Sequence, residues 1–419
     1  MNPVPTPLIH ASKPPPEHPV NYAVIPQSDP HSSYLLHHAS ILDALVRTLD
    51  SGRLVLGPRT FLFEEVFASF LGTTDVIGVG SGTDALVIAL RACAVEPGDA
   101  VITVSYTATA TVAAIELAEA IPVLADIDPL TFTLCPESLE TTIREYSARP
   151  EAALHPLKAV IVVHLFDHPA DLPAIVKICA LYNLILIEDC AQAHGASYGG
   201  RMVGSWGKAG AFSFHPTQNL AGVGDGGAVA TSVPAVAQMA RQLRQYGWKE
   251  RYVSFIPGMN SRLDEIQAAV LQVRLPHLTD ENSSRRAIAN CYNELLADVP
   301  VVCPVVHGPV NHVFHQYVLR SPQRNAIREW LKTRGIQTRI HYPFPIHLQP
   351  AYQDRLFHVK GGLPHSEKAA RELLSLPMYP QLNEDQISRT AAAVAGFYTR
   401  NKFQTEDGME SVGLSDLPG

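Results

Sequence analysis

The chain lacks the features that mark membrane-spanning, secreted and nucleic-acid-binding proteins. Its 419 residues contain no apolar run long enough to cross a bilayer and no long cluster of Lys and Arg. The formal net charge is −8, which argues against a nucleic-acid or anionic-membrane surface. Residues 1–20 are rich in proline and lack the layout of a signal peptide, so we expect a disordered tail there.

Cysteine is also sparse, and no two cysteines form a CxxC pair. The six are Cys93, Cys135, Cys179, Cys190, Cys291 and Cys303. Scattered cysteines of this kind predict free thiols in a cytoplasmic protein, with no structural zinc, iron–sulfur cluster or other metal.

The remaining composition is that of an ordinary globular protein, with 46% hydrophobic and 17% charged residues. A chain of this length can bury a large core and carry a smaller appended unit. We expect a large domain over residues 21–275, a small domain over residues 276–400 and a disordered tail over residues 401–419. Whether roughly the first 35 residues of the large domain join the small one is left open.

Short apolar runs alternate with helical periodicity from Asp75 onward. The expected strands are residues 76–79, 100–104, 121–125, 158–164, 184–187, 209–214 and 228–231, and the expected helices between them are 83–94, 107–118, 136–146 and 170–182. This pattern predicts an α/β fold with a mostly parallel sheet covered by helices on both faces. Ligands of such sheets bind beyond the carboxyl ends of the strands.

The pattern after Val233 is mainly helical and then alternates again. We expect helices over residues 235–246, 263–274, 277–296 and 325–334, a strand over residues 315–320, and a last helix that ends at about Tyr398. Asn383 and Gln386 have the spacing of a capping box at the start of that helix. The sequence therefore predicts a smaller C-terminal α/β unit.

Two strand ends carry residues suited to an anionic, aromatic ligand. Gly80-Ser-Gly82-Thr83-Asp-Ala follows one strand and opens a helix, where free N–H groups and the helix dipole can hold a phosphate. An ordinary strand-to-helix turn explains that segment equally well. Tyr106 follows the next strand, where an aromatic ring can stack on a flat cofactor or simply pack in the core.

A carboxylate lies at the end of a third strand, in Ile185-Leu-Ile-Glu-Asp189-Cys-Ala-Gln192-Ala-His-Gly. A buried acid requires a cationic partner, and a pyridinium N–H is one such partner. The alternative is that Asp189 caps the next helix. Further along, Ala211-Phe-Ser213-Phe-His215-Pro-Thr-Gln218-Asn-Leu precedes the glycine-rich turn Gly222-Val-Gly-Asp-Gly-Gly.

Together these segments resemble the DegT/DnrJ/EryC1/StrS family of sugar aminotransferases, which are fold-type I pyridoxal phosphate (PLP) enzymes with a seven-stranded-type sheet. The resemblance covers residues 21–400 and includes Gly258-Met-Asn260-Ser-Arg-Leu-Asp-Glu and Gly335-Ile-Gln-Thr-Arg-Ile-His341-Tyr-Pro. It implies amino transfer from glutamate or glutamine to a nucleotide-linked keto-deoxysugar, in sugar or secondary-metabolite biosynthesis.

The resemblance also implies roles for individual residues. Gly82, Thr83 and Ser213 would hold the cofactor phosphate, Tyr106 would stack on the ring, Asp189 would pair with the ring nitrogen, and Gln192 would contact the ring hydroxyl. Asn260 would reach the cofactor of a second subunit, which implies a homodimer with shared active sites; on its own it would be a helix N-cap. His341 would approach the sugar nucleotide, or be a structural histidine.

Gln218 departs from the family pattern, which has the cofactor-binding lysine at this position. A glutamine amide is neither nucleophilic nor basic, so PLP or its aminated form (PMP) would bind noncovalently. Three interpretations remain open: an aminotransferase whose lysine was replaced, a natural lysine-free enzyme such as a PMP-dependent sugar dehydratase, or an inactive sugar-nucleotide-binding paralogue. His215 is the nearest candidate base in the sequence.

Overall fold

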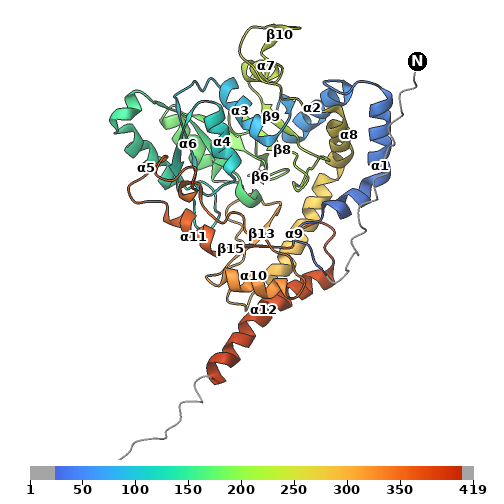
Figure 1. The fold of residues 1–419 in the computed structure, drawn as a ribbon, viewed down its shortest axis with the longest axis vertical. Helices are drawn as coiled ribbons and strands as arrows, with labels where there is room; N and C mark the ends of the chain where they lie inside the picture. The colour runs from blue at the N-terminus through green and yellow to red at the C-terminus, as the bar shows by residue number, and fades with distance from the viewer. Residues whose placement is uncertain (1–23, 408–419) are drawn as a thin grey trace, which may run out of the picture.

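A central sheet of eight strands organises residues 24–407, the part of the chain that the computed structural model describes (Figure 1). Its order is β1-β9-β8-β5-β4-β2-β3-β14, formed by β1 (Asp75–Val79), β9 (Gly227–Thr231), β8 (Ala209–Ser213), β5 (Ile185–Asp189), β4 (Leu157–Val163), β2 (Ala100–Val104), β3 (Ile121–Ala125) and β14 (Phe357–His358). Neighbours from β8 to β14 are parallel, whereas β9 is antiparallel to both β8 and β1. The expected mostly parallel sheet is confirmed.

Apolar residues explain why these strands lie inside. β2 has the sequence Ala-Val-Ile-Thr-Val and is buried at every position, as expected for a strand covered on both faces. The covering helices are α3 (Gly82–Ala92), α4 (Thr109–Leu117), α5 (Pro136–Ser147), α6 (Leu172–Leu181), α7 (Pro234–Leu243) and α8 (Glu265–Arg274). These helices match the expected ones, with ends that differ by up to three residues.

Two helices before the sheet were not expected from the sequence. They are α1 (Pro30–Asp50) and α2 (Pro58–Leu71), and both pack on α8. A usable signal was present at the start of α1, because Asp29 accepts a hydrogen bond from the Ser32 N–H and proline occupies the first helical turn.

A smaller body lies below the sheet in Figure 1, at the lower end of helix α9 (Leu278–Leu295). It contains the antiparallel pair β13 (Tyr317–Arg320) and β15 (Leu373–Leu376) and the helices α10 (Arg324–Lys332), α11 (Pro364–Glu372) and α12 (Glu384–Asp407). Its buried cluster includes Ile25, which bridges to Ile336, so the start of the described chain packs here. The domain boundaries themselves stay a prediction.

Several short elements complete the fold. They are β6 (Ser197–Tyr198), β7 (Arg201–Met202), β10 (Trp248–Glu250), β11 (Val253–Ser254), β12 (Val310–Asn311) and the 3₁₀ turns η1 (Pro150–Ala153), η2 (Leu165–Asp167), η3 (Leu275–His277) and η4 (Ile346–Leu348). The hairpin of β10 and β11 projects beyond α7 at the top of Figure 1.

The last helix corrects one expectation. The capping box is confirmed, because Asn383 and Gln386 exchange backbone-to-side-chain hydrogen bonds of 3.1 and 2.9 Å. However, α12 continues to Asp407 instead of ending near Tyr398, since the chain from Phe397 to Asp407 contains no glycine or proline that would break it. The expected disorder is therefore wrong for residues 401–407, which belong to α12, and residues 408–419, like residues 1–23, lie outside the described range.

Two further observations concern the described residues. None of their helices is both long and apolar enough to cross a membrane. All six cysteine thiols are unpaired, as the sequence predicted.

Candidate active site

A cavity of about 350 Å³ opens where the carboxyl ends of β4, β5 and β8 meet the start of α3. Most of the residues that the sequence singled out line this cavity: Gly82, Thr83, Asp189, Gln192, Ser213, His215 and Gln218. These residues are separated by up to 136 positions (218 − 82) along the chain, and the parallel sheet brings them to one edge. The cavity lining, in the described part of the chain, includes no lysine.

The start of α3 forms one wall of the cavity. Ser81 caps the helix by accepting a hydrogen bond from the Asp84 N–H at 3.1 Å, so the first helical turn begins at Gly82. A side chain on Gly82 would collide with Ser213, whose Cβ would lie 2.6 Å from the added carbon. The N–H groups of the first turn have no partners within the helix, and together with the Thr83 and Ser213 hydroxyls they can hold a phosphate.

Asp189 also lines the cavity, at the end of β5. It accepts hydrogen bonds from the Thr111 hydroxyl at 2.8 Å and from the Ala191 N–H at 3.2 Å. Burial raises the pKa of this carboxyl, and these two hydrogen bonds only partly offset that effect. A buried carboxyl of this kind fits a cationic ring nitrogen, which would bring its pKa down again. Asp189 is not the cap of a helix, because α6 precedes it and no helix follows until α7.

Gln192 is held in one orientation by two neighbours. Its Oε1 accepts the Phe166 N–H at 3.0 Å, and its Nε2 donates to the Tyr342 hydroxyl at 3.1 Å. Sequence reasoning missed Tyr342 as a site residue, although it lies within the quoted segment around His341. Burial raises the pKa of the Tyr342 hydroxyl to about 12, so it stays protonated and can donate a hydrogen bond into the cavity.

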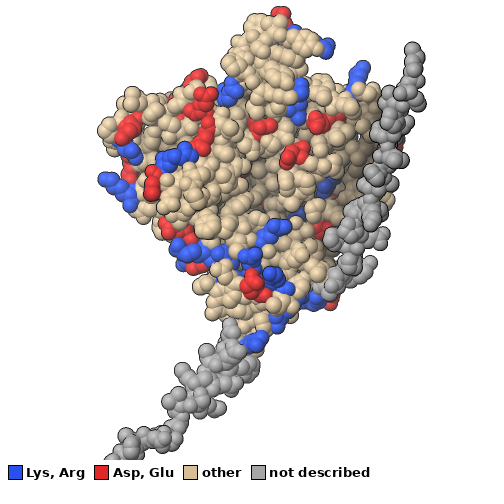
Figure 2. Space-filling view, viewed as in Figure 1, with Lys and Arg blue, Asp and Glu red and all other residues tan. Residues whose placement is uncertain are grey.

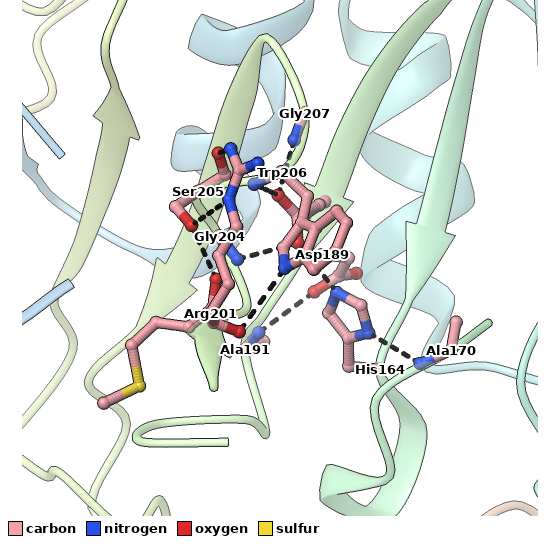
Figure 3. A network of polar contacts seen from close by, with 11 residues as sticks. His164, Ala170, Asp189, Ala191, Arg201, Gly204, Ser205, Trp206 and Gly207 are labelled. Atoms are coloured by element: carbon pink, nitrogen blue, oxygen red, sulfur yellow. Dashed lines mark hydrogen bonds and ion pairs between the residues drawn. The ribbon is translucent and has the colours of Figure 1, made fainter. Parts of the chain in front are cut away.

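A second network of polar contacts lies next to Asp189 (Figure 3). The carboxylate of Glu188 accepts backbone N–H groups from Gly204, Trp206 and Gly207, each at 2.7 Å. His164, which lines the cavity, places Nε2 3.1 Å from Glu188, while its Nδ1 accepts the Ala170 N–H. Nδ1 therefore carries no proton, and the neutral ring donates from Nε2.

This network is also the place to look for a metal. Ligand atoms of His164, Glu188 and Cys190 lie within 4.8 Å of one another. The histidine and carboxylate atoms already make the protein hydrogen bonds described above, and burial raises the pKa of the Cys190 thiol, which disfavours the thiolate. We therefore propose no metal here.

Gln218 and His215 occupy the segment between β8 and β9. The Gln218 N–H donates to the His215 carbonyl at 2.9 Å, and the Gln218 Oε1 is buried without a hydrogen-bond partner among the described residues. His215 is exposed at the rim, and its Nδ1 lies 3.0 Å from the Thr217 hydroxyl. The ring thus has a hydroxyl neighbour outside the cavity, which leaves its role as a base a hypothesis.

Three residues named from the sequence do not line the cavity. Tyr106 is fully buried behind it, where its hydroxyl donates to the His341 carbonyl at 2.7 Å and accepts the Tyr342 N–H at 2.9 Å. His341 bonds the Ser375 hydroxyl through Nδ1 at 2.8 Å and faces a different, larger cavity. Asn260 is exposed beside the β10–β11 hairpin, and it is not a helix N-cap, because Asp264 precedes α8.

Residues 37–395 match the DegT/DnrJ/EryC1/StrS aminotransferase family. Two relatives are each 41% identical to the chain. The pleiotropic regulatory protein of Geobacillus stearothermophilus aligns over 377 residues, 89% of this chain and 98% of its own. The dTDP-3-amino-3,4,6-trideoxy-α-D-glucose transaminase of Streptomyces venezuelae aligns over 371 residues, 88% of this chain and 95% of its own.

Solved structures give the same result for the fold. DesV from S. venezuelae superposes with a TM-score of 0.84 at 41% identity, over 89% of this chain and 98% of DesV. NtdA from Bacillus subtilis, solved with bound PMP, superposes with a TM-score of 0.79 at 29% identity, over 87% of this chain and 82% of NtdA. The chain therefore has the fold of these aminotransferases, and relatives with bound PMP indicate use of PLP or PMP.

Proposed function

Because the chain belongs to the DegT/DnrJ/EryC1/StrS aminotransferase family, we propose that it transfers an amino group from glutamate or glutamine to a nucleotide-linked keto-deoxysugar, with noncovalently bound PLP or PMP. One observation carries the proposal: a single cavity joins a helix N-terminus, a buried carboxyl and a fixed amide but is lined by no lysine. When bound, the cofactor supplies an electron sink for the carbon that loses its proton.

The protein's own residues would bind and orient the cofactor. The N–H groups at the start of α3, with the Thr83 and Ser213 hydroxyls, would hold the phosphate. Asp189 would hold a proton on the ring nitrogen, and Gln192 and the Tyr342 hydroxyl would contact the ring substituents. Tyr106 would support that wall from behind by fixing the backbone at His341 and Tyr342.

A groove next to this cavity supports an anionic substrate. His341 and Tyr342 are adjacent in the chain, and the first lines this groove of about 690 Å³ while the second lines the cofactor cavity. Arg328, Lys332 and Arg339 also line the groove. Lys and Arg side chains gather in this lower part of the molecule, around α10 (Figure 2). Such a charge suits the diphosphate of a nucleotide sugar.

An apolar surface supports the homodimer. Leu35, Leu42, Val46 and Leu49 share one face of α1 and are exposed, and Phe61 on α2 is 55% exposed. Exposed apolar side chains that share one face of a helix are typical of a protein–protein interface. In the homodimer Asn260 would reach the partner's cofactor. Sedimentation of Leu42→Glu against wild type tests this: we expect a monomer, and an unchanged dimer would contradict the assigned interface.

The unpaired thiols indicate the cellular compartment of the protein. All six cysteines are free, which suits the reducing cytoplasm, where we place the protein.

The amino-transfer proposal is tested with purified protein loaded with PLP. Excess glutamate or glutamine should convert several equivalents of PLP into PMP, and a dTDP-linked keto-deoxyhexose should then be converted into an amino sugar, detected by mass spectrometry. A deoxy sugar without nitrogen would identify a dehydratase instead. Cofactor binding without conversion would contradict the transfer step, and no binding would contradict the cofactor assignment.

A further inference from the structure

Gln218 lines a second, much smaller cavity in addition to the cofactor cavity. This cavity of about 20 Å³ lies where the segment after β8 meets α8, α9 and the smaller body, and the side chains of Arg274, Arg285 and Gln381 also line it. A space of this size holds one water molecule, or at most two.

Four of the residues that line this cavity each carry a polar side-chain atom with no partner among the described residues. Two are donors, the Nε–H groups of Arg274 and Arg285, and two are acceptors, the Oε1 atoms of Gln218 and Gln381. Both arginines are more than nine-tenths buried. An unpaired polar group in such a place is destabilising, so four of them on residues that line one cavity point to a common hydrogen-bond partner.

The two guanidinium groups are otherwise fixed. Arg274 donates from Nη1 to the Ala221 carbonyl at 3.0 Å and from Nη2 to the Ser33 hydroxyl. Arg285 donates from Nη1 to the carbonyls of Phe314 and Met378, both at 3.3 Å. Because these contacts hold the head groups in place, their Nε–H groups cannot turn away to find other acceptors.

Charge and size together identify the partner. The carboxylates of Asp29 and Glu281 line the cavity with the two arginines, so positive and negative groups are balanced and a free anion is not favoured. The unpaired set contains both donors and acceptors, which a water molecule can satisfy simultaneously and a chloride or phosphate ion cannot.

We propose that this cavity is a water-binding site, and that its water holds the Gln218 amide with Oε1 toward the arginines and the NH₂ group toward the cofactor cavity. The donors on the arginine side set this orientation, since a water accepts only two hydrogen bonds, which the two Nε–H groups use, and an NH₂ group on that side would be left without an acceptor. Gln218 is then a fixed hydrogen-bond donor at the position of the family lysine, and its ligand is an oxygen or nitrogen acceptor. This second half rests on the proposed function.

The water is tested by a high-resolution crystal structure of the cofactor-free protein. We expect a peak within about 3.5 Å of the Gln218 oxygen and of at least one arginine Nε. A crystal soaked in bromide should show no anomalous peak there. An empty cavity, or a bromide peak, would overturn the water site.

The donor role is tested by the dissociation constant of PMP, measured by calorimetry. We expect Gln218→Met to weaken binding about fivefold, the effect of one lost hydrogen bond, while Gln353→Met, at an exposed position, changes nothing. Equal affinity of Gln218→Met and wild type would overturn the donor role. Wild-type protein that binds no PMP would contradict the proposed function, and the crystal structure would still decide the water site.

Discussion

Two groups of residues that line the cofactor cavity differ in the secondary structure on which they lie. Gly82, Thr83 and Asp189 lie on regular elements, at the start of α3 and the end of β5, whereas Gln218 lies in the irregular segment between β8 and β9. The first group has the chemistry that noncovalent binding of a phosphorylated pyridine requires. Gln218 lacks the amine that would attach it. The proposed function therefore treats cofactor binding and covalent attachment as separate properties of this site.

Asp189 and Gln218 also differ in how their polar groups are satisfied. Asp189 has two protein donors and a raised pKa, so a cation entering the cavity gains a charge partner. The Gln218 oxygen has no donor among residues 24–407, and Gln218 lines the small polar cavity together with Arg274 and Arg285. Asp189 is therefore positioned by protein hydrogen bonds to meet a cation in the cavity, whereas the Gln218 side chain depends on a partner in the small cavity.

The largest expected effect comes from restoring an amine at position 218. In Gln218→Lys we expect a covalent bond to PLP, trapped by borohydride, and a gain in turnover of ~10²–10⁴-fold, because the lysine can also move a proton. Mass spectrometry and steady-state kinetics measure both, and a variant that stays noncovalent would contradict the equivalence of position 218.

The next largest effect concerns Asp189, the proposed partner of the ring nitrogen. Asp189→Asn should weaken PLP binding by ~10²-fold or more, because the ring nitrogen loses its charge partner. The cofactor-free variant should be as stable as wild type, since a neutral amide no longer has to be desolvated as a charge. Fluorescence titration and thermal unfolding measure the two. Unchanged affinity would contradict the assigned role of Asp189.

Loss of the proposed contact between the Ser213 hydroxyl and the cofactor phosphate should have a smaller effect. Ser213→Ala removes one hydroxyl donor to a charged group, and we expect about tenfold weaker PLP binding. Thr217→Ala is the matched control, because Thr217 follows in the same segment but contacts His215 and does not line the cofactor cavity. Equal losses in the two variants would show that the segment, not the phosphate contact, was disturbed.

The smallest effect is expected at His194, where a substitution should change the pH dependence of stability but not cofactor binding. Burial lowers the pKa of His194 to about 3, far below its ordinary value of 6.5, so the folded state holds the neutral ring. Its contribution is complete above pH 6.5 and is lost as the pH falls from there toward 3, because the unfolded chain takes up a proton. His194→Phe, which keeps the packing against Phe212 and Phe214, should reduce the pH slope of unfolding by up to 1.36 kcal/mol per pH unit.

Chemical denaturation between pH 5 and pH 7 measures that slope. PLP affinity should not change, because His194 does not line the cofactor cavity. An unaltered slope would mean that the ring is charged or solvated in the folded state.

Much of the fold could be predicted because local pattern and final structure agree. The expected strands at residues 100–104 and 121–125 coincide with β2 and β3, which are continuous apolar runs bounded by turns. α1 was missed because several of its apolar residues, including Leu35, Leu36 and Leu49, are exposed. Its apolar residues therefore do not form the single core-facing stripe by which an amphipathic helix is predicted. α12 was expected to end too early, because a polar sequence without glycine or proline continues a helix.

The site could be predicted only where its residues are contiguous in motifs. Asp189 and Ser213 end strands, Gly82 and Thr83 come shortly after one, and the sheet places all four residues together. Tyr342 and the small cavity could not be predicted, because they depend on contacts across the chain, such as Gln192 with Tyr342 and Gln218 beside Arg274 and Arg285. The stacking role of Tyr106 stays a prediction: its ring is buried beside the cavity and its hydroxyl is hydrogen-bonded to the backbone of residues 341 and 342.

The central claim is that the cofactor binds without a covalent bond, and borohydride reduction tests it most directly. Wild-type protein loaded with PLP is treated with borohydride, denatured, freed of small molecules and weighed by intact-mass spectrometry, with Gln218→Lys as the positive control. We predict the unmodified mass for wild type and a mass increased by one reduced cofactor for the variant. A wild-type adduct that peptide mapping places on a lysine of the site would contradict the account.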